Sequence, residues 1–176
     1  SEEILKALIQ MFAIIAIQDG GIEDKEMQYV ESFLTQQLGK DAANEYLLGF
    51  KKQIDEATEK QKNVTSVKMS VKILGLCRKI NKTINQRQKI IVLVRLFELL
   101  NTSKKFTEQR MAIINTVGEV FNISSDEFKD IQKFVVNNAI SEIDTPSILI
   151  IIKLIIVTKI ISVLIVSIII IIFVLN

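Results

Sequence analysis

The sequence contains no histidine, no tryptophan, one cysteine and one proline among its 176 residues. Without histidine the chain cannot form a Ser-His-Asp or Cys-His nucleophile pair, a His-Glu-x-x-His metal site or a histidine general base. The single cysteine, Cys77, excludes an intrachain disulfide and a cysteine-based zinc site, and its apolar surroundings predict a buried, unreactive thiol. Since a glycine-rich phosphate loop is also missing, we expect a protein that is not an enzyme.

The chain also lacks a large excess of either charge, because 22 basic and 20 acidic residues give a formal net charge of +2. Lys153 and Lys159 are the only charged residues in 145–176, and the rest of the chain is balanced. A nucleic-acid-binding protein needs basic residues clustered on one face and often aromatic side chains on which bases stack. Aromatic residues make up 6% of this chain, and we expect no nucleic-acid partner.

The densest basic cluster comprises Arg78, Lys79, Lys82, Arg87 and Lys89. Such a cluster could contact anionic lipid headgroups if it faced a membrane. A solvated polar connection between two helices is the simpler interpretation, and it is the one that the sequence favours.

Apolar residues recur at helical spacing throughout the stretch 1–140, and no segment alternates apolar and polar residues as a half-buried strand would. The turn Asp19-Gly20-Gly21 separates the first two helices, because glycine accepts the left-handed backbone at a helix end. We expect helices that begin near residues 2, 23, 41, 66, 84, 108 and 125. Seven short helices predict an all-α bundle, with the apolar run 90–100 as its central and most buried helix.

Polar residues at fixed spacings predict several of the helix starts. Asp41, Thr83 and Thr107 are candidate N-caps, and Ser124 with Glu127 has the spacing of a capping box. The fourth helix is expected to turn four apolar residues inward: Val67, Val71, Leu74 and Ile80.

Two helix–loop–helix units superpose when the sequence is shifted so that Leu8 falls on Val92. The same 84-residue offset places Phe12 on Leu96 in the first helix of each unit. The matches continue past the loop, with Met27 on Met111, Val30 on Ile114 and Phe33 on Val117. Apolar matches on both sides of a loop are hard to obtain from one helix face, so we expect an internal duplication. The alternative is two unrelated amphipathic hairpins.

The first unit carries a motif in which an alanine-containing helix is followed by Asp19-Gly20, the apolar Ile22 and, four residues later, Glu26. Through these residues the stretch 1–140 resembles the TerB-like domain, a family that includes tellurite-resistance TerB and the N-terminal domain of the DjlA co-chaperone. The resemblance implies an all-α bundle of about seven helices built from two helix–loop–helix repeats. It also implies a role in tellurite-type stress responses.

In the TerB-like family the acidic loop residues are associated with metal binding, and the corresponding residues here are Asp19, Glu23 and Glu26. The second repeat has Ser103 and Arg110 in place of Asp19 and Glu26. A site that needs acids from both repeats would therefore lack half its ligands and meet a repelling charge. We therefore expect no cofactor, and an ordinary turn before an acid-rich helix start is the favoured interpretation of these acids. A weak divalent-cation site at Asp19, Glu23 and Glu26 is the alternative.

Residues 148–175 form an apolar run with five polar interruptions: Lys153, Thr158, Lys159, Ser162 and Ser167. About 20 apolar residues cross the roughly 30 Å of hydrocarbon in a bilayer. Lys159 lies near the start of the stretch 154–175, where its side chain can reach the headgroups. The sequence therefore predicts a helical domain over 1–141, a linker over 142–147 and one transmembrane helix over 148–175.

Three other interpretations of the tail stay open. The run could be a buried core helix of a soluble domain, or a buried strand followed by a helix, because isoleucine and valine favour strands. Isoleucine occupies almost half of the positions in 147–176, so the run could also be a frame-shifted translation of AT-rich DNA.

The positive charges of Lys153 and Lys159 lie on the N-terminal side of the run, which predicts a single-pass cell-membrane protein with its helical domain in the cytoplasm. We expect a membrane-tethered, non-enzymatic module that binds an unidentified protein partner. One alternative is the N-terminal accessory domain of a larger protein, such as a transport-related ATPase or a co-chaperone, whose remainder is lost by truncation or frameshift. The other is a divalent-cation-binding sensor.

Overall fold

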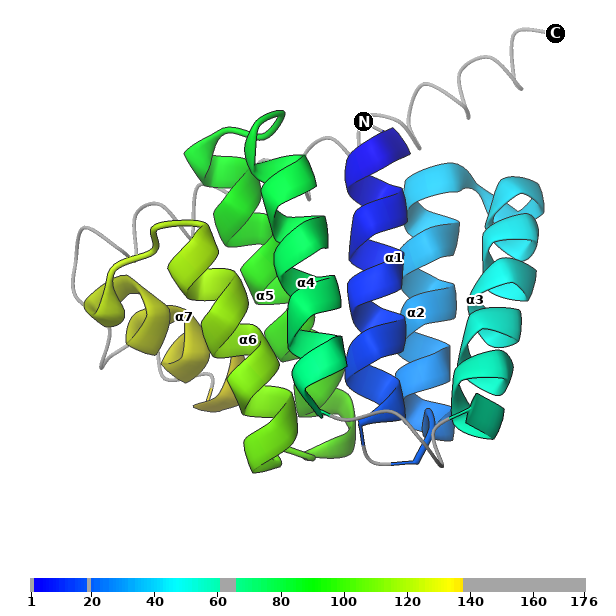
Figure 1. The fold of residues 1–176 in the computed structure, drawn as a ribbon. Helices are drawn as coiled ribbons and strands as arrows, with labels where there is room; N and C mark the ends of the chain where they lie inside the picture. Colours follow the sequence, from blue (N-terminus) through cyan, green and yellow to red (C-terminus); the bar gives the residue numbers. More distant parts are fainter. Residues whose placement is uncertain (1, 19, 61–65, 138–176) are drawn as a thin grey trace, which may run out of the picture.

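A computed structural model describes residues 2–18, 20–60 and 66–137 of the chain, and within these ranges it contains seven α-helices and no strand (Figure 1). The helices follow one another in the order expected from the apolar periodicity. They are α1 (Glu2–Ile17), α2 (Asp24–Leu38), α3 (Lys40–Lys60), α4 (Ser66–Asn81), α5 (Gln86–Ser103), α6 (Glu108–Val120) and α7 (Ser125–Asn137). The all-α prediction is confirmed for this part of the chain.

Side-chain caps define the starts of the later helices. Thr107 accepts a hydrogen bond from the Arg110 backbone N–H at the start of α6. Ser124 and Glu127 form the expected capping box before α7, with the Glu127 N–H donating to Ser124 Oγ and the Ser124 N–H donating to the Glu127 carboxylate. These two predicted helix starts are confirmed.

Two other predicted N-caps are wrong. Helix α5 begins two residues later than expected, because Asn85 and Gln88 form a reciprocal capping box there. Thr83 instead donates its hydroxyl to the Ile80 carbonyl and closes the end of α4. Asp41 lies inside the first turn of α3, which already begins at Lys40.

The core is built around α1 and α5. Helix α1 packs against α3, α4 and α5, whereas α5 packs against α1, α2, α6 and α7. Ten residues of α1 are buried, against seven of the longer α5. The prediction that 90–100 forms the most buried helix is therefore wrong, because Arg95 and Glu98 keep one side of α5 partly open to water.

The predicted apolar face of α4 is confirmed only in part: Ile80 is buried and Leu74 is half-buried, whereas the side chain of Val67 lies outside the described part of the structure. Ile73, Cys77 and Ile80 are buried against its neighbours α1 and α6. Val71, expected in the core, has 63% of its surface exposed. The sequence of α4 contains two apolar stripes. Contacts with α1 and α6 decide which stripe is buried, and the pattern of a single helix does not contain that information.

The 84-residue offset recurs in the structure. The N-cap residues Glu23 and Thr107 are separated by this offset, and so are the left-handed residues Gly20 and Lys104 that follow α1 and α5. The units α1–α3 and α5–α7 thus correspond helix by helix, with α4 as the additional helix between them.

The expected domain end at residue 141, the linker over 142–147 and the transmembrane helix over 148–175 lie outside the described residues. Among the helices that the structure does describe, none has the length and apolar character needed to span a bilayer.

Candidate functional site

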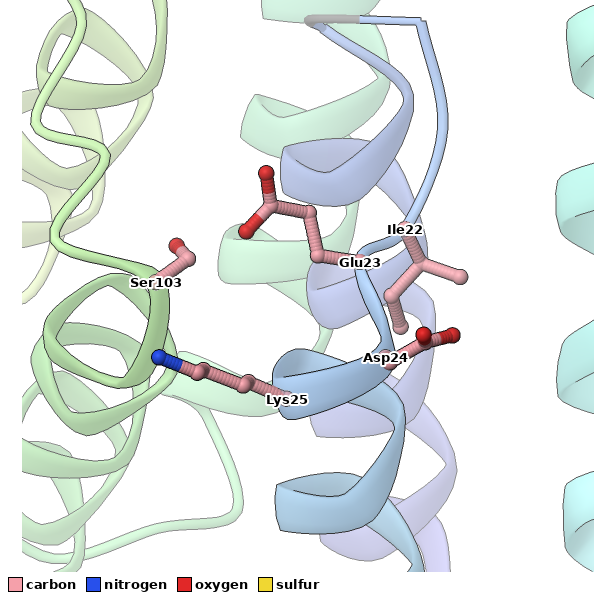
Figure 2. Close-up of a pocket in the computed structure, with 5 residues that line it drawn as sticks. All are labelled: Ile22, Glu23, Asp24, Lys25 and Ser103. Carbon is pink, nitrogen blue, oxygen red and sulfur yellow. The ribbon is translucent and has the colours of Figure 1, made fainter.

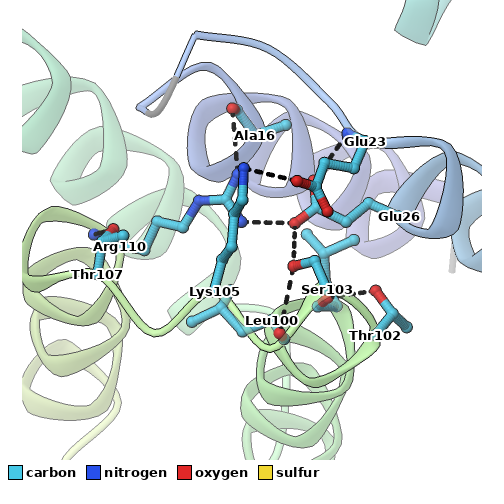
Figure 3. A network of polar contacts seen from close by, with 10 residues as sticks. Ala16, Glu23, Glu26, Leu100, Thr102, Ser103, Lys105, Thr107 and Arg110 are labelled. Atoms are coloured by element: carbon cyan, nitrogen blue, oxygen red, sulfur yellow. Dashed lines mark hydrogen bonds and ion pairs between the residues drawn. The ribbon is translucent and has the colours of Figure 1, made fainter.

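The loop between α1 and α2 meets the loop between α5 and α6 at one polar junction (Figure 3). Its central residues are Glu26 and Arg110, which hold the third position after the N-cap in α2 and in α6, respectively. The 84-residue correspondence therefore places opposite charges at equivalent positions of the two repeats, and the fold brings these two positions into contact.

Glu26 and Arg110 form an ion pair in which neither residue has exposed surface. The Arg110 guanidinium donates to Glu26 Oε1 at 2.5 Å and to the Ala16 carbonyl at 3.4 Å. Ser103 Oγ also donates to Glu26 Oε1, at 2.7 Å, and the Glu23 backbone N–H donates to Glu26 Oε2 at 3.2 Å. Glu26 Oε1 thus accepts from two residues of the second unit, and Glu26 Oε2 accepts from the backbone of the first.

The geometry of this pair matches what a buried charge requires. Removing an ion from water costs several kcal/mol, and only a partner with good hydrogen bonds offsets that cost. Removal of one member of such a pair typically costs about 3–5 kcal/mol, because the other charge stays buried without compensation. The Glu26–Arg110 pair therefore fixes how the two loops sit against each other.

A second ion pair lies at the rim of the junction. Lys105 Nζ is 2.6 Å from Glu23 Oε1, and each side chain is 40% exposed. The hydrogen bond from Lys105 holds the pKa of Glu23 below its ordinary value. Solvent screens this pair, so its contribution to stability is much smaller than that of the buried pair.

A shallow pocket opens beside the junction, between the start of α2 and the end of α5 (Figure 2). It is lined by Ile22, Glu23, Asp24, Lys25 and Ser103. Figure 2 shows the Lys25 side chain extending towards α5, whereas Ile22 and Asp24 point away from Ser103. The lining carries charges of both signs, as a solvated surface depression commonly does.

Two of the three residues predicted to bind a cation, Glu23 and Glu26, lie at this junction, and the third, Asp19, lies outside the described residues. Glu26 is occupied by Arg110 and Glu23 by Lys105. Among the described residues, no group of three or more His, Cys, Asp or Glu side chains is arranged to hold a metal ion. A divalent cation at Glu26 would have to displace a buried guanidinium, and the present arrangement of these residues does not fit the metal that the family resemblance implies.

The sequence indicated that Arg110 would repel a cation but not that Arg110 would bind Glu26 directly. The 84-residue offset contained a signal, because it places Glu26 and Arg110 at equivalent positions of the two loops. A glutamate and an arginine at equivalent positions are therefore candidates for a direct pair.

A further polar cluster, between α2 and α5, was not predicted. The Tyr29 hydroxyl donates to Glu98 Oε2 at 2.6 Å, and Arg95 Nη1 lies 2.7 Å from the same oxygen. The Arg95 guanidinium also lies over the Phe33 ring, 5.6 Å from its centroid. Burial, with a smaller effect of the Glu98 charge, raises the pKa of Tyr29 far above its ordinary value. This cluster ties the second helix of one repeat to the first helix of the other.

These observations define an all-α domain, seven-helical within the described residues, in which the α1–α2 and α5–α6 loops are joined by a buried ion pair. Residues 5–133 match the family described as tellurite resistance protein TerB, and the chain belongs to that family. No curated protein and no solved structure is significantly similar to the chain.

Proposed function

We propose that this chain is a membrane-tethered module of the TerB family that works by binding another protein during a tellurite-type stress response. In this proposal the helical domain lies in the cytoplasm, and the apolar run 148–175 anchors it as a single transmembrane helix. The proposal does not assign the domain a catalytic role.

The observation that carries the binding role is the internal neutralisation of the junction. Arg110 occupies the Glu26 carboxylate and Lys105 occupies Glu23, within a domain that belongs to the TerB family. A junction whose acids are already paired with cations of the same chain favours a fixed scaffold over a site that takes up an ion.

The tether is supported by the sequence. Lys153 and Lys159 are the only charged side chains in the run 148–175. The length and apolar character of the run suit a bilayer span, and the position of the two lysines favours a cytoplasmic domain.

Membrane partition tests the tether. The full chain and a shortened chain ending at Thr145 are expressed in a bacterial host, and their membranes are washed with alkaline carbonate. We expect the full chain to stay in the pellet and the shortened chain to be soluble and helical by circular dichroism. A full chain that is released by carbonate, or that is found only in aggregates without lipid, would contradict the tether.

Co-purification tests the binding role. The full chain is chemically cross-linked in cells with and without tellurite and then isolated in detergent. The proposal predicts a specific cross-linked protein that is recovered more strongly under tellurite stress. Identical recovery with and without tellurite would contradict the role in that stress response.

A sensor for divalent cations is the second candidate function, and it would use Glu23, released from Lys105, together with Asp24 at the same open pocket. Calorimetric titration of the full chain with calcium or magnesium separates it from the first. A heat of binding that is lost when Glu23 is changed to Gln and Asp24 to Asn would favour the sensor. The absence of any heat of binding at millimolar cation would exclude the sensor.

A further inference from the structure

The charges of this nearly neutral chain are strongly segregated along the sequence. Residues 60–97 hold ten of the 22 basic residues and none of the 20 acidic ones, whereas residues 1–59 hold twelve acidic and five basic residues. Helix α4 lies entirely inside the acid-free stretch. The small net charge therefore conceals a basic region centred on α4.

The basic residues of α4 share its outer face. Lys72, Arg78 and Lys79 are exposed, whereas Ile73, Cys77 and Ile80 on the opposite face are buried. At about 100° per residue, the exposed positions 71, 72, 75, 78 and 79 fall within an arc of about 120°. Lys82 and Arg87 continue this surface into the connection with α5 and its first turn, and both are exposed. We call these five cations, together with Val71, the α4 surface.

The cations of the α4 surface differ from the three cations that α5, α6 and the loop between them pair with glutamates. Arg95, Lys105 and Arg110 are each paired with a glutamate. In the described part of the chain, no carboxylate lies within ion-pair distance of a cation of the α4 surface. Their positive charge is therefore available to an outside partner.

Two features favour a lipid surface over a nucleic acid as that partner. Val71, 63% exposed, places an apolar side chain among the cations, as in helices that lie in the interface of a bilayer. No aromatic residue occurs between positions 60 and 96, so bases would find nothing on which to stack.

We propose that the α4 surface docks on the anionic headgroups of a lipid bilayer. The cations contact phosphate-bearing headgroups, and Val71 enters the boundary between headgroups and acyl chains. The contact gives the domain a defined orientation on the bilayer, which anchoring by the run 148–175 alone does not specify. It does not require the tether, because electrostatic attraction and the apolar contact act on an untethered domain as well.

The test places an environment-sensitive dye on the full chain at either of two exposed apolar positions. Val71→Cys reports on α4, and Leu48→Cys, at a position 70% exposed on α3, is the matched control. Cys77 has no exposed surface, and burial raises its pKa to about 12, so the unchanged chain serves as the labelling control. Vesicles contain phosphatidylcholine alone or an equal mixture of phosphatidylcholine and phosphatidylglycerol.

We expect the dye at position 71 to shift to the blue with the anionic vesicles and not with phosphatidylcholine alone, while the dye at position 48 stays unchanged. About 1 M salt shortens the Debye length to about 3 Å and should abolish the shift. Each cation near an anionic surface contributes about fivefold in affinity, so Lys72→Glu with Lys79→Glu should weaken the response by about 25-fold or more. Lys51→Glu with Lys52→Glu, on α3, should leave it intact.

Equal responses at positions 71 and 48, a response that ignores lipid charge, or a response to short duplex DNA but not to vesicles would each overturn the proposal. Carbonate extraction of the same vesicles tests the tether separately. A blue shift that salt reverses would support the α4 surface even if carbonate releases the chain from the vesicles. A dye at position 71 that does not respond, on a chain that resists carbonate, would refute the α4 surface without contradicting the tether.

Discussion

Lys104 ends α5 in the left-handed backbone conformation, with φ of 59°, at the position equivalent to Gly20 in the first repeat. A residue with a Cβ pays about 1 kcal/mol or more for this conformation, and glycine does not. We predict that Lys104→Gly raises the free energy of unfolding by about 0.5–1 kcal/mol, measured by urea denaturation.

Lys104→Ala is the matched control for this prediction. It removes the same charge and the same hydrogen bond from Lys104 Nζ to Asn101 Oδ1, but it keeps the Cβ. If the alanine variant were as stable as the glycine variant, the backbone explanation would be wrong.

Cys77 makes the stability of the fold depend on pH in the alkaline range. Burial raises the pKa of its thiol from 9.0 to about 12. Between these values the unfolded chain has released the proton that the folded chain keeps, so stability falls as pH rises through this window. The slope is at most about 1.4 kcal/mol per pH unit.

We predict that Cys77→Ala flattens the decline in stability between about pH 8.5 and 9.5, where most tyrosines of the unfolded chain still keep their protons. Denaturation midpoints of both proteins across that range give the comparison. Parallel declines in the two proteins would show that the thiol does not titrate as the structure implies.

At the scale of the helices, Gly118 allows α6 to approach Phe128 at the start of α7. A Cβ added at Gly118 would lie 2.8 Å from Phe128 Cδ2. The Phe128 ring is itself held edge-on against Phe97, with the ring centroids 5.3 Å apart. Gly118→Ala is therefore expected to lower stability by about 1–3 kcal/mol despite the higher helix propensity of alanine.

Gly49 on α3 provides the comparison for Gly118, because nothing lies within 4 Å of a Cβ added there. Gly49→Ala should raise stability by up to about 1 kcal/mol, as helix propensity alone predicts. Thermal unfolding of the two variants distinguishes the cases. A stabilising Gly118→Ala would mean that α6 and α7 do not approach as closely as described.

The helices also show what local sequence can and cannot predict. Thr107 and the Ser124–Glu127 pair were predictable helix starts, because a cap depends on residues three apart in the chain. The buried face of α4 was not, since Val71 and Ile73 are equally apolar and only contacts with α1 and α6 decide between them. The greater burial of α1 than of α5 likewise depends on which helices cover each, and periodicity does not contain that information.

At the scale of the whole molecule, the all-α fold class was predictable because helices leave a periodic apolar pattern in the sequence. The position of Glu23 and Glu26 at one junction was also predictable from their spacing. Their partners were not, since Lys105 and Arg110 come from the other repeat and meet the acids only through the tertiary fold. The acids predicted to bind a divalent cation are therefore paired with lysine and arginine side chains of the same chain.

The α1–α2 and α5–α6 loops are joined at this junction by a pair of opposite charges, Glu26 and Arg110. In this account Arg110 alone neutralises the buried Glu26, and the loops stay together without a metal. A chelator should then leave the stability of the domain unchanged, and the pair should be strongly coupled.

A double-mutant cycle on Glu26→Leu and Arg110→Met tests this claim most directly, with unfolding free energies measured by denaturant in the presence of a chelator. Each single change should cost about 3–5 kcal/mol, because it leaves a buried charge without its partner. The double variant should lose far less than the sum, with a coupling energy of at least about 2 kcal/mol. Additive losses, or a wild-type chain that the chelator destabilises, would contradict the account.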